Sequence, residues 1–208
     1  MMEQDLDPIL STIVRTLRVK YKCHTVVLYG SRARGLQTST SDYDVFGVCR
    51  RGKKFRIAKQ QNGFYWDVFV YSEKDLVNLS DEHFSWKNAR VLYQEGSYAK
   101  DLMSRLDKLL SKPFQKQPKT EINVLKVWAQ KELDRCRIDD IQGLYRRVEL
   151  LNAFVDHYYF IRQKRFWGPK AGFEWIRKHD PDVYQMILKS LKDPSNTNLL
   201  VAAASKVY

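Results

Sequence analysis

Apolar residues recur at helical spacing in some parts of the chain and cluster in short runs in others. Between residues 3 and 20 they return every three or four positions, which is typical of a helix with one buried face. Short runs rich in β-branched and aromatic residues predict strands at 25–29, 43–49, 55–61 and 64–71. The last two runs flank Asn62-Gly63, the dipeptide that most strongly favours a two-residue hairpin turn. Segments 84–94 and 98–110 return to helical spacing, and we expect helices there.

The second half of the chain shows helical spacing without a convincing strand pattern. We expect helices at about 120–133, 141–165, 170–178, 181–191 and 194–204. Residues 111–120 hold two prolines and three lysines, a composition that favours a linker. The predicted fold class is therefore α+β, with a small mixed-sheet domain over 1–112, a linker over 113–119 and an all-helical bundle over 120–208.

The chain is strongly basic. Its 208 residues include 36 lysines and arginines against 24 aspartates and glutamates, which gives a formal net charge of +12. A surplus of this size indicates an anionic partner, such as nucleic acid, nucleotide phosphate or a membrane surface. The surplus is spread along the whole chain, which favours a general anionic environment over a dedicated nucleic-acid-binding arm. The densest local cluster comprises Arg50, Arg51, Lys53, Lys54, Arg56 and Lys59.

Composition argues against several other classes of protein. With 44% hydrophobic residues, 29% charged residues, nine glycines and six prolines, the chain is globular rather than collagen-like or disordered. Its three cysteines are far apart and form no C-x-x-C pair, which argues against a zinc site or a disulfide framework. No apolar run approaches the length of a membrane helix, and the acidic first residues are unlike a secretion leader. We therefore expect a cytoplasmic protein with no membrane partner.

A polar turn follows the first predicted strand. Gly30 lets the backbone turn tightly and lets a ligand approach where a Cβ would block it. A short helix starting at Ser31 would offer its first backbone N–H groups and the Ser31 hydroxyl to an anion. The turn is therefore a candidate phosphate site.

Three aspartates lie in or beside the predicted strands. Asp42 and Asp44 are two residues apart, so strand alternation directs both carboxylates to one face and Tyr43 to the other. Adjacent carboxylates repel unless a cation lies between them, and Mg²⁺ prefers carboxylate and phosphate oxygens. Asp67 lies in the second hairpin strand among apolar neighbours, where an ionised group is costly unless it is paired or bound to a metal. Taken in this order, the three aspartates predict a divalent metal site near the turn.

The chain resembles the DNA polymerase beta-like nucleotidyltransferase superfamily over about residues 25–71. The shared signature is a strand–turn–helix–strand order that carries Gly30-Ser31-x-Ala33-x-Gly35 and then Ser41-Asp42-x-Asp44. Asp67 falls where that superfamily keeps its third carboxylate. The layout of a small sheet domain followed by a helical bundle also resembles, more loosely, the kanamycin nucleotidyltransferase group and related minimal nucleotidyltransferases.

This resemblance implies a specific chemistry. The catalytic and metal-binding residues would be Asp42, Asp44 and Asp67, with two Mg²⁺ ions as cofactors. A nucleoside triphosphate such as ATP would bind at the turn, contacting Gly30, Ser31, Arg32, Arg34 and Ser41. An acceptor hydroxyl would attack the α-phosphorus in line, and pyrophosphate would leave.

In proteins of this architecture the helical half would supply the acceptor site. Glu149, Asn152 and Asp156 are spaced to share one face of the long predicted helix. A carboxylate on that face could take the proton from the acceptor hydroxyl, so Glu149 is a catalytic candidate and Asp156 its alternative. Asp67 is a competing candidate for the same role.

Three hypotheses about function stay open. The first expects a small-molecule acceptor, such as an aminoglycoside-like compound. The second keeps the same transfer but directs it to RNA, such as tRNA, or to protein, as in toxin–antitoxin members of the superfamily. The third is a non-catalytic module that binds nucleotide or RNA, and the intact set of Asp42, Asp44 and Asp67 argues against it. The basic cluster lies on the predicted hairpin, which keeps an RNA acceptor open.

Overall fold

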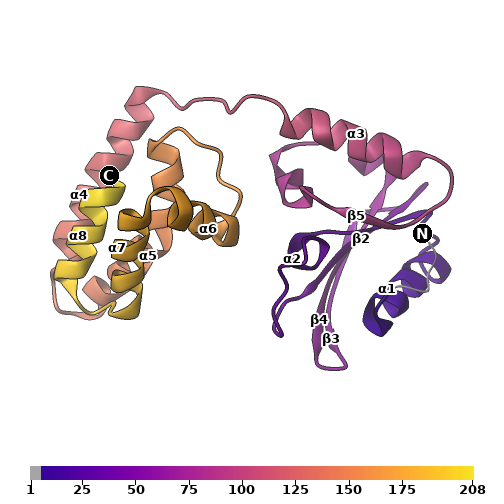
Figure 1. The fold of residues 1–208 in the computed structure, drawn as a ribbon, viewed down its shortest axis with the longest axis horizontal. Helices are drawn as coiled ribbons and strands as arrows, with labels where there is room; N and C mark the ends of the chain where they lie inside the picture. Colours follow the sequence, from indigo (N-terminus) through magenta and orange to yellow (C-terminus); the bar gives the residue numbers. More distant parts are fainter. Residues whose placement is uncertain (1–5) are drawn as a thin grey trace. The chain divides into compact units, whose positions relative to one another are not determined.

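The chain divides into two compact units, Met1–Lys112 and Pro113–Tyr208 (Figure 1). The computed structural model describes residues 6–208. The first unit combines a mixed sheet with helices, and the second is built of helices. The α+β class expected from the sequence is therefore confirmed.

The sheet of the first unit has five strands, β1 (Thr25–Leu28), β2 (Tyr43–Cys49), β3 (Phe55–Gln61), β4 (Phe64–Ser72) and β5 (Arg90–Gln94). Their order across the sheet is β3-β4-β2-β1-β5. Strand β2 runs parallel to β4, and the other neighbouring pairs are antiparallel. The Asn62-Gly63 turn joins β3 to β4 with Gln61 opposite Phe64, as the hairpin signal predicts.

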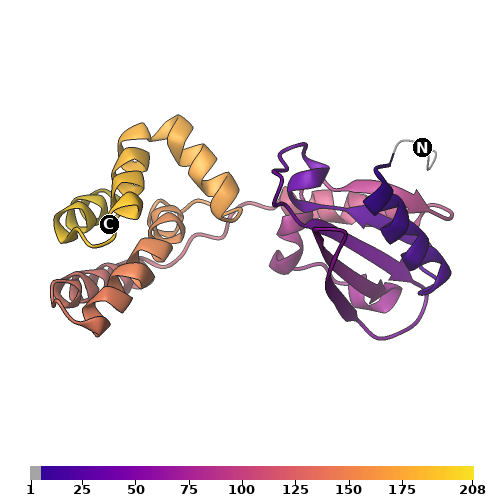
Figure 2. The same cartoon turned by 90° about the horizontal axis from the view of Figure 1, so that it is seen from below.

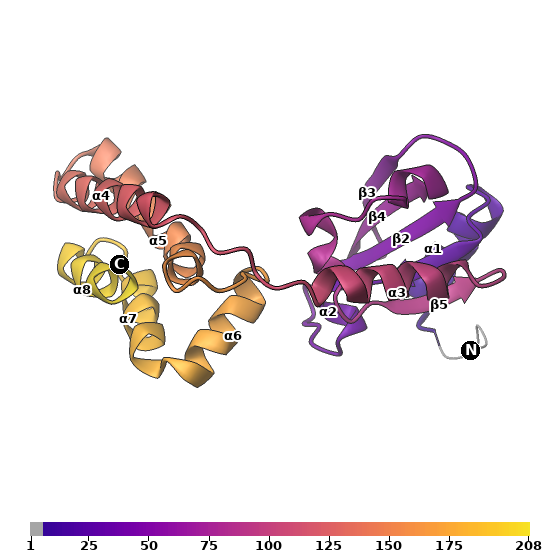
Figure 3. The same cartoon turned by 90° about the horizontal axis from the view of Figure 1, so that it is seen from above.

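Helices cover both faces of this sheet. The helical elements are α1 (Pro8–Val19), α2 (Gly30–Ala33), α3 (Tyr98–Leu110) and the 3₁₀ helices η2 (Glu73–Leu76) and η3 (Asp81–Trp86). Helix α1 lies in front of the sheet in Figure 2 and α3 lies in front of it in Figure 3, so the two helices pack on opposite faces. Because side chains alternate between the two faces along a strand, the strand residues on both faces of the sheet can then be apolar.

Helix α1 begins where its sequence can satisfy the first backbone N–H groups. The Asp7 carboxylate accepts hydrogen bonds from the N–H groups of Ile9 and Leu10, at 3.0 and 2.9 Å, and Pro8 occupies the first helical position. The buried side of the helix carries Leu10, Ile13, Val14 and Leu17. These side chains form one core cluster with sheet residues that include Val26, Val45, Trp66 and Val68.

The opposite face of the sheet packs against α3 and η3. Phe46 of β2 stacks on Trp86 of η3 with 4.0 Å between the ring centroids, and both side chains are buried. Leu102 and Leu106 of α3 belong to the same cluster. This face therefore has an apolar centre, and the aspartates of β2 and β4 lie at its edge.

The prediction of a helix over 84–94 is wrong. Element η3 ends at Trp86, Asn88 takes a left-handed backbone conformation with φ of 62°, and residues 90–94 form β5. Strand β5 pairs with β1, with Thr25 opposite Gln94. Pairing with a distant strand outweighs the helical spacing here, because the β1 edge would otherwise leave backbone groups without partners.

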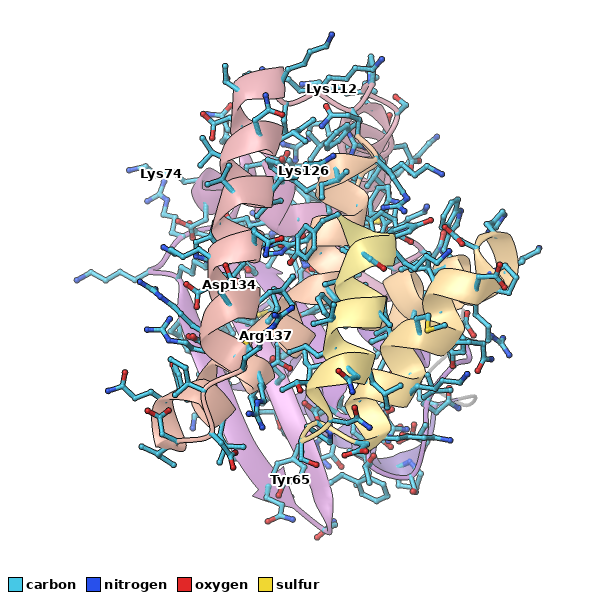
Figure 4. The ribbon with its side chains drawn as sticks, turned by 90° about the vertical axis from the view of Figure 1, so that its left-hand side faces the viewer. Tyr65, Lys74, Lys112, Lys126, Asp134 and Arg137 are labelled. Carbon is cyan, nitrogen blue, oxygen red and sulfur yellow. The ribbon has the colours of Figure 1, made fainter. Side chains whose placement is uncertain are left out.

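The second unit consists of α4 (Lys119–Cys136), α5 (Ile141–Ile161), α6 (Pro169–His179), α7 (Pro181–Lys192) and α8 (Thr197–Val207). Its core is formed by Leu150 and Phe154 of α5 together with side chains of the neighbouring helices, among them Ile176, Ile187 and Leu200. Lys126, Asp134 and Arg137 are exposed along α4 and at its end (Figure 4). None of the helices within residues 6–208 combines the length and the apolar character needed to cross a membrane.

We predict that Phe154→Ala destabilises the second unit, because the Phe154 ring is 0% exposed in its core. Removing a buried ring leaves a cavity and costs about 3–5 kcal/mol. Chemical denaturation measures this loss, and hydrogen–deuterium exchange should become faster in α5. The control Leu144→Ala lies on the exposed side of α5, and it should change the unfolding free energy by less than about 0.5 kcal/mol. Equal losses for the two variants would contradict the core described above.

Candidate active site

Two of the three predicted carboxylates are neighbours across the sheet. Asp44 of β2 and Asp67 of β4 are direct register partners in the parallel pair, and adjacent strands lie about 4.8 Å apart. Both residues are half-buried, and alternation places them on the face that carries Phe46 and Phe69 further along the two strands. Asp42 lies just before β2 and is exposed. The parallel register therefore brings two carboxylates from distant sequence positions to one end of the sheet.

Gly30 lies directly against the carboxylate of Asp44. It takes a left-handed conformation with φ of 72°, and a Cβ at this position would overlap Asp44 Oδ2. The Tyr29 N–H donates to the Asp44 carbonyl oxygen at 2.9 Å, which joins the turn to the start of β2. Helix α2 starts at Gly30, one residue before the expected start, and Ser31 is buried. Glycine is thus required here both for its backbone conformation and for the close approach of Asp44.

Arg32 holds the chain in front of β2. Its guanidinium donates from Nε to the Asp42 carbonyl at 3.0 Å and from Nη2 to the Ser41 carbonyl at 2.9 Å. It also lies over the Tyr43 ring, 3.8 Å from the centroid. These contacts position the segment that carries Asp42.

Arg34 and Ser41 are also bound to backbone groups of this region. Arg34 Nε donates to the Gly30 carbonyl at 3.1 Å. The Ser41 hydroxyl accepts a hydrogen bond from the Thr38 N–H at 2.9 Å and so stabilises a short turn before Asp42. Both residues shape the loops around the candidate phosphate site, and their direct contact with a nucleotide stays a prediction.

Asp67 is engaged by a residue of the neighbouring strand. Arg56 of β3 donates from Nε to Asp67 Oδ1 at 2.7 Å and from Nη2 to Asp67 Oδ2 at 2.9 Å. The hydrogen bonds to the carboxylate, and then its charge, raise the pKa of the Arg56 guanidinium above its ordinary value. Among its apolar neighbours Asp67 could be accommodated by an ion pair or by a metal ion, and here it forms an ion pair.

Tyr29 lies beside the candidate site and was not among the residues predicted for it. It follows β1 at the same end of the sheet and is buried. Burial raises the pKa of its phenol far above the ordinary value, and the negative charges of Asp67 and Asp44 raise it further. Tyr29 therefore keeps a neutral hydroxyl close to both carboxylates at neutral pH. Its position directly before Gly30 was the signal available in the sequence.

A surface hollow of about 350 Å³ lies at the β3–β4 hairpin beside Asp67. Its lining includes Asp42, Arg56, Lys59, Gln60, Tyr65 and Asp67. Tyr65 is exposed, and Figure 4 shows it near the tip of the hairpin. The hollow thus combines two carboxylates with two cationic side chains, and its volume lies within the range of small-ligand pockets.

The carboxylates at this end of the sheet have the chemistry that Mg²⁺ prefers, since this ion binds carboxylate oxygens together with phosphate oxygens. Among residues 6–208, no group of three or more His, Cys, Asp or Glu side chains is arranged as a metal site. Both oxygens of Asp67 accept hydrogen bonds from Arg56 instead. The direct pairing of Asp44 with Asp67 fits a Mg²⁺ ion once Asp67 is released, and the three-aspartate metal set stays a prediction.

Glu149 lies in the second unit, on the exposed side of α5. It forms a hydrogen bond with the Tyr145 hydroxyl, which raises the pKa of that phenol. Its role as a general base stays a prediction.

The fold divides the basic cluster into two parts. Arg50, Arg51, Lys53 and Lys54 are exposed in the loop between β2 and β3, at the opposite end of β2 from Asp44. Arg56 and Lys59 lie on β3 and line the hollow next to Asp67. The four cations of the β2–β3 loop therefore lie at the opposite end of β2 from the candidate site, whereas Arg56 and Lys59 lie beside it.

The first unit matches a known protein family. Residues 10–99 match the family model described as a nucleotidyltransferase domain, and this range contains the Gly30 turn and all three aspartates. Over residues 10–99 the first unit is therefore similar to nucleotidyltransferase domains, in line with the resemblance that the Gly30 turn and the three aspartates suggest. The crystal structure of a nucleotidyltransferase-like protein from Exiguobacterium sibiricum 255-15 is similar over 94% of this chain and 73% of its own, with 15% sequence identity and a TM-score of 0.44. No curated protein matches the chain.

The ion pair between Arg56 and Asp67 could have been predicted from the sequence. A two-residue turn at Asn62-Gly63 sets the register that places Ala58 opposite Asp67. Arg56 then lies on the same face, diagonal to Asp67 and within reach for a long side chain. Hairpin register, applied to the basic cluster, would have singled out Arg56.

We predict that Gly30→Ala is more destabilising than Gly35→Ala. Both glycines have positive φ, at 72° and 70°, but an added Cβ meets Asp44 only at Gly30, and at Gly35 nothing lies within 4 Å. The left-handed conformation costs alanine about 1–2 kcal/mol at either position. The overlap with Asp44 should cost about 1–3 kcal/mol more. Urea denaturation compares the two free energies of unfolding, and equal losses would show that Gly30 does not lie against Asp44.

Proposed function

We propose that the protein is a Mg²⁺-dependent enzyme that transfers a nucleoside monophosphate from a nucleoside triphosphate to an acceptor hydroxyl. The observation that carries this proposal is the direct pairing of Asp44 with Asp67 beside the Gly30 turn, within a nucleotidyltransferase domain. Carboxylates against a glycine turn combine metal ligands with a place for phosphate oxygens.

In this proposal Asp42, Asp44 and Asp67 hold the metal ions. When bound, the ions supply positive charge that neutralises the phosphates during transfer. Asp44 is positioned for this role by its place in β2 and by the turn at Gly30. Asp67 is available once its pair with Arg56 opens.

The turn and the loop before β2 form the proposed nucleotide site. The backbone at Gly30 and Ser31 binds phosphate oxygens, and Ser41 lies on the loop opposite. Arg32 and Arg34 keep both segments in place through their hydrogen bonds to backbone carbonyls. Because these groups are held before substrate arrives, little reorganisation is needed during the reaction.

The reaction balances as a displacement at the α-phosphorus. The acceptor oxygen forms a bond to the α-phosphorus, while the bond from the α-phosphorus to the oxygen of the β-phosphate breaks. Pyrophosphate leaves with that oxygen, and the hydroxyl proton passes to a base. Asp67 and Glu149, with Asp156 as the alternative to Glu149, are the candidates for this base.

An aminoglycoside-like small molecule is the first candidate acceptor, and RNA or protein is the alternative. The exposed cations of the β2–β3 loop support the RNA alternative, because a polyanion gains affinity from each phosphate that is neutralised. We propose that the protein acts in the cytoplasm, in keeping with its unpaired cysteines.

We predict that Asp44→Asn lowers Mg²⁺-dependent nucleotidyl transfer at least about 100-fold, since loss of a metal ligand removes several kcal/mol of transition-state stabilisation. The assay incubates the protein with each α-labelled nucleoside triphosphate, Mg²⁺ and a fractionated cell extract, and follows label into acceptor fractions. Asp101→Asn, an exposed change on α3, is the matched control and should retain activity.

The same assay separates the open hypotheses. Label in a small-molecule fraction supports the first acceptor, and label on an RNA or protein band supports the alternative. Labelling that persists unchanged in Asp44→Asn contradicts the proposed active site. Nucleotide binding without labelling of any fraction supports a non-catalytic module.

A further inference from the structure

The ion pair between Arg56 and Asp67 places an arginine where the proposed function needs a metal ion. Both carboxylate oxygens of Asp67 accept hydrogen bonds from the guanidinium, at 2.7 and 2.9 Å. A divalent ion bound to the same carboxylate would lie next to a guanidinium of like charge, and the two would repel. The pair and the metal therefore compete for Asp67. This inference rests on the proposed function, because it concerns the same carboxylate.

The position of Arg56 allows its ion pair with Asp67 to open. Arg56 lies on β3, the edge strand of the sheet, and its side chain is 56% exposed, while that of Asp67 is 22% exposed. Because more than half of the Arg56 side chain is exposed, water can solvate the guanidinium after it separates from Asp67. The guanidinium also lies 5.3 Å from the centre of the Phe69 ring, a weak attraction at an exposed site. Arg56 is thus free to move into solvent, while Asp67 needs a replacement partner such as a metal ion when the pair opens.

The surroundings offer Arg56 another partner when substrate is present. A guanidinium binds carboxylate and phosphate with the same two-pronged geometry. Arg56 lines the same hollow as Asp42 and Asp67, so an anionic group bound there lies within its reach. Lys59, Gln60 and Tyr65 line the hollow as well and suit a polar anionic ligand.

We propose that Arg56 is a positioning residue that guards Asp67: it occupies the carboxylate in the absence of substrate and exchanges it for an anionic substrate group when the metal ion binds. The exchange makes metal capture depend on substrate. The site then binds the metal ion more tightly when there is a phosphate to transfer.

The test measures Mn²⁺ affinity by electron paramagnetic resonance of the free ion, since Mn²⁺ prefers the same oxygen ligands as Mg²⁺. Arg56→Gln should bind Mn²⁺ about two- to fivefold more tightly than the wild type, the range expected for loss of an exposed pair. Lys59→Gln is the matched control. It removes one positive charge from the same hollow. Lys59 does not pair with Asp67 but donates a hydrogen bond to Gln61 and lies over the Trp66 ring. An equal gain of Mn²⁺ affinity in Lys59→Gln would show a general effect of charge and overturn the proposed role of Arg56.

A double-mutant cycle shows whether the effect passes through Asp67. In an Asp67→Asn background, Arg56→Gln should no longer change the affinity for Mn²⁺, because there is no carboxylate left to release. The same gain in both backgrounds would contradict the proposal. Circular dichroism of each variant confirms that the fold is kept.

Sulfate provides the test of the exchange. It binds arginine but is not a substrate, so sulfate in place of chloride at constant ionic strength should draw Arg56 away from Asp67. The difference in Mn²⁺ affinity between the wild type and Arg56→Gln should then shrink. A difference that sulfate leaves unchanged would overturn the exchange.

Asp44→Asn separates failure of this inference from failure of the proposed function. If Asp44→Asn binds Mn²⁺ as the wild type does, the metal site itself is wrongly assigned. If it loses Mn²⁺ binding while Arg56→Gln leaves the affinity unchanged, the metal site stands and the guard does not.

Discussion

The parallel pairing of β2 with β4 is the interaction on which the site depends. It sets Asp44 directly opposite Asp67 on the same face of the sheet, although 23 residues separate them in the chain. A shift of one residue in this register would turn the carboxylate of one strand toward the opposite face. The register is held by apolar residues on both faces, with Val45 and Val68 packed toward α1 and Phe46 packed toward η3.

The same carboxylates constrain the turn and the edge strand around them. Gly30 can lie against Asp44 only because it has no Cβ, so the turn and β2 approach more closely than other residue types would allow. On the other side, Arg56 donates two hydrogen bonds to the carboxylate of Asp67 and so ties the edge strand β3 to β4. Tyr29 remains protonated beside both acids. Two carboxylates, a guanidinium and a neutral phenol therefore lie close together at this end of the sheet.

Local signals predicted most of the elements correctly. The Asn62-Gly63 turn and the strands on either side lie where their composition places them, and so do α3 and the helices of the second unit. The exception is segment 84–94, whose apolar spacing indicates a helix but which contains η3 and β5 instead. The reason is long-range: β1 needs a partner for its outer edge, and β5 provides it. The spacing of apolar residues within so short a segment contains no information about strand pairing with β1.

For the site, the sequence by itself determined where the candidate residues stand: the glycine turn, Asp42 and Asp44 two residues apart, and a third aspartate among apolar neighbours. It determined them because strand alternation and glycine conformation are local properties of the chain. Only the tertiary structure decided that Asp44 lies opposite Asp67, that Gly30 lies against Asp44, and that Arg56 is the partner of Asp67. These pairings arise between strands, where register and packing, rather than distance along the chain, decide which charges meet.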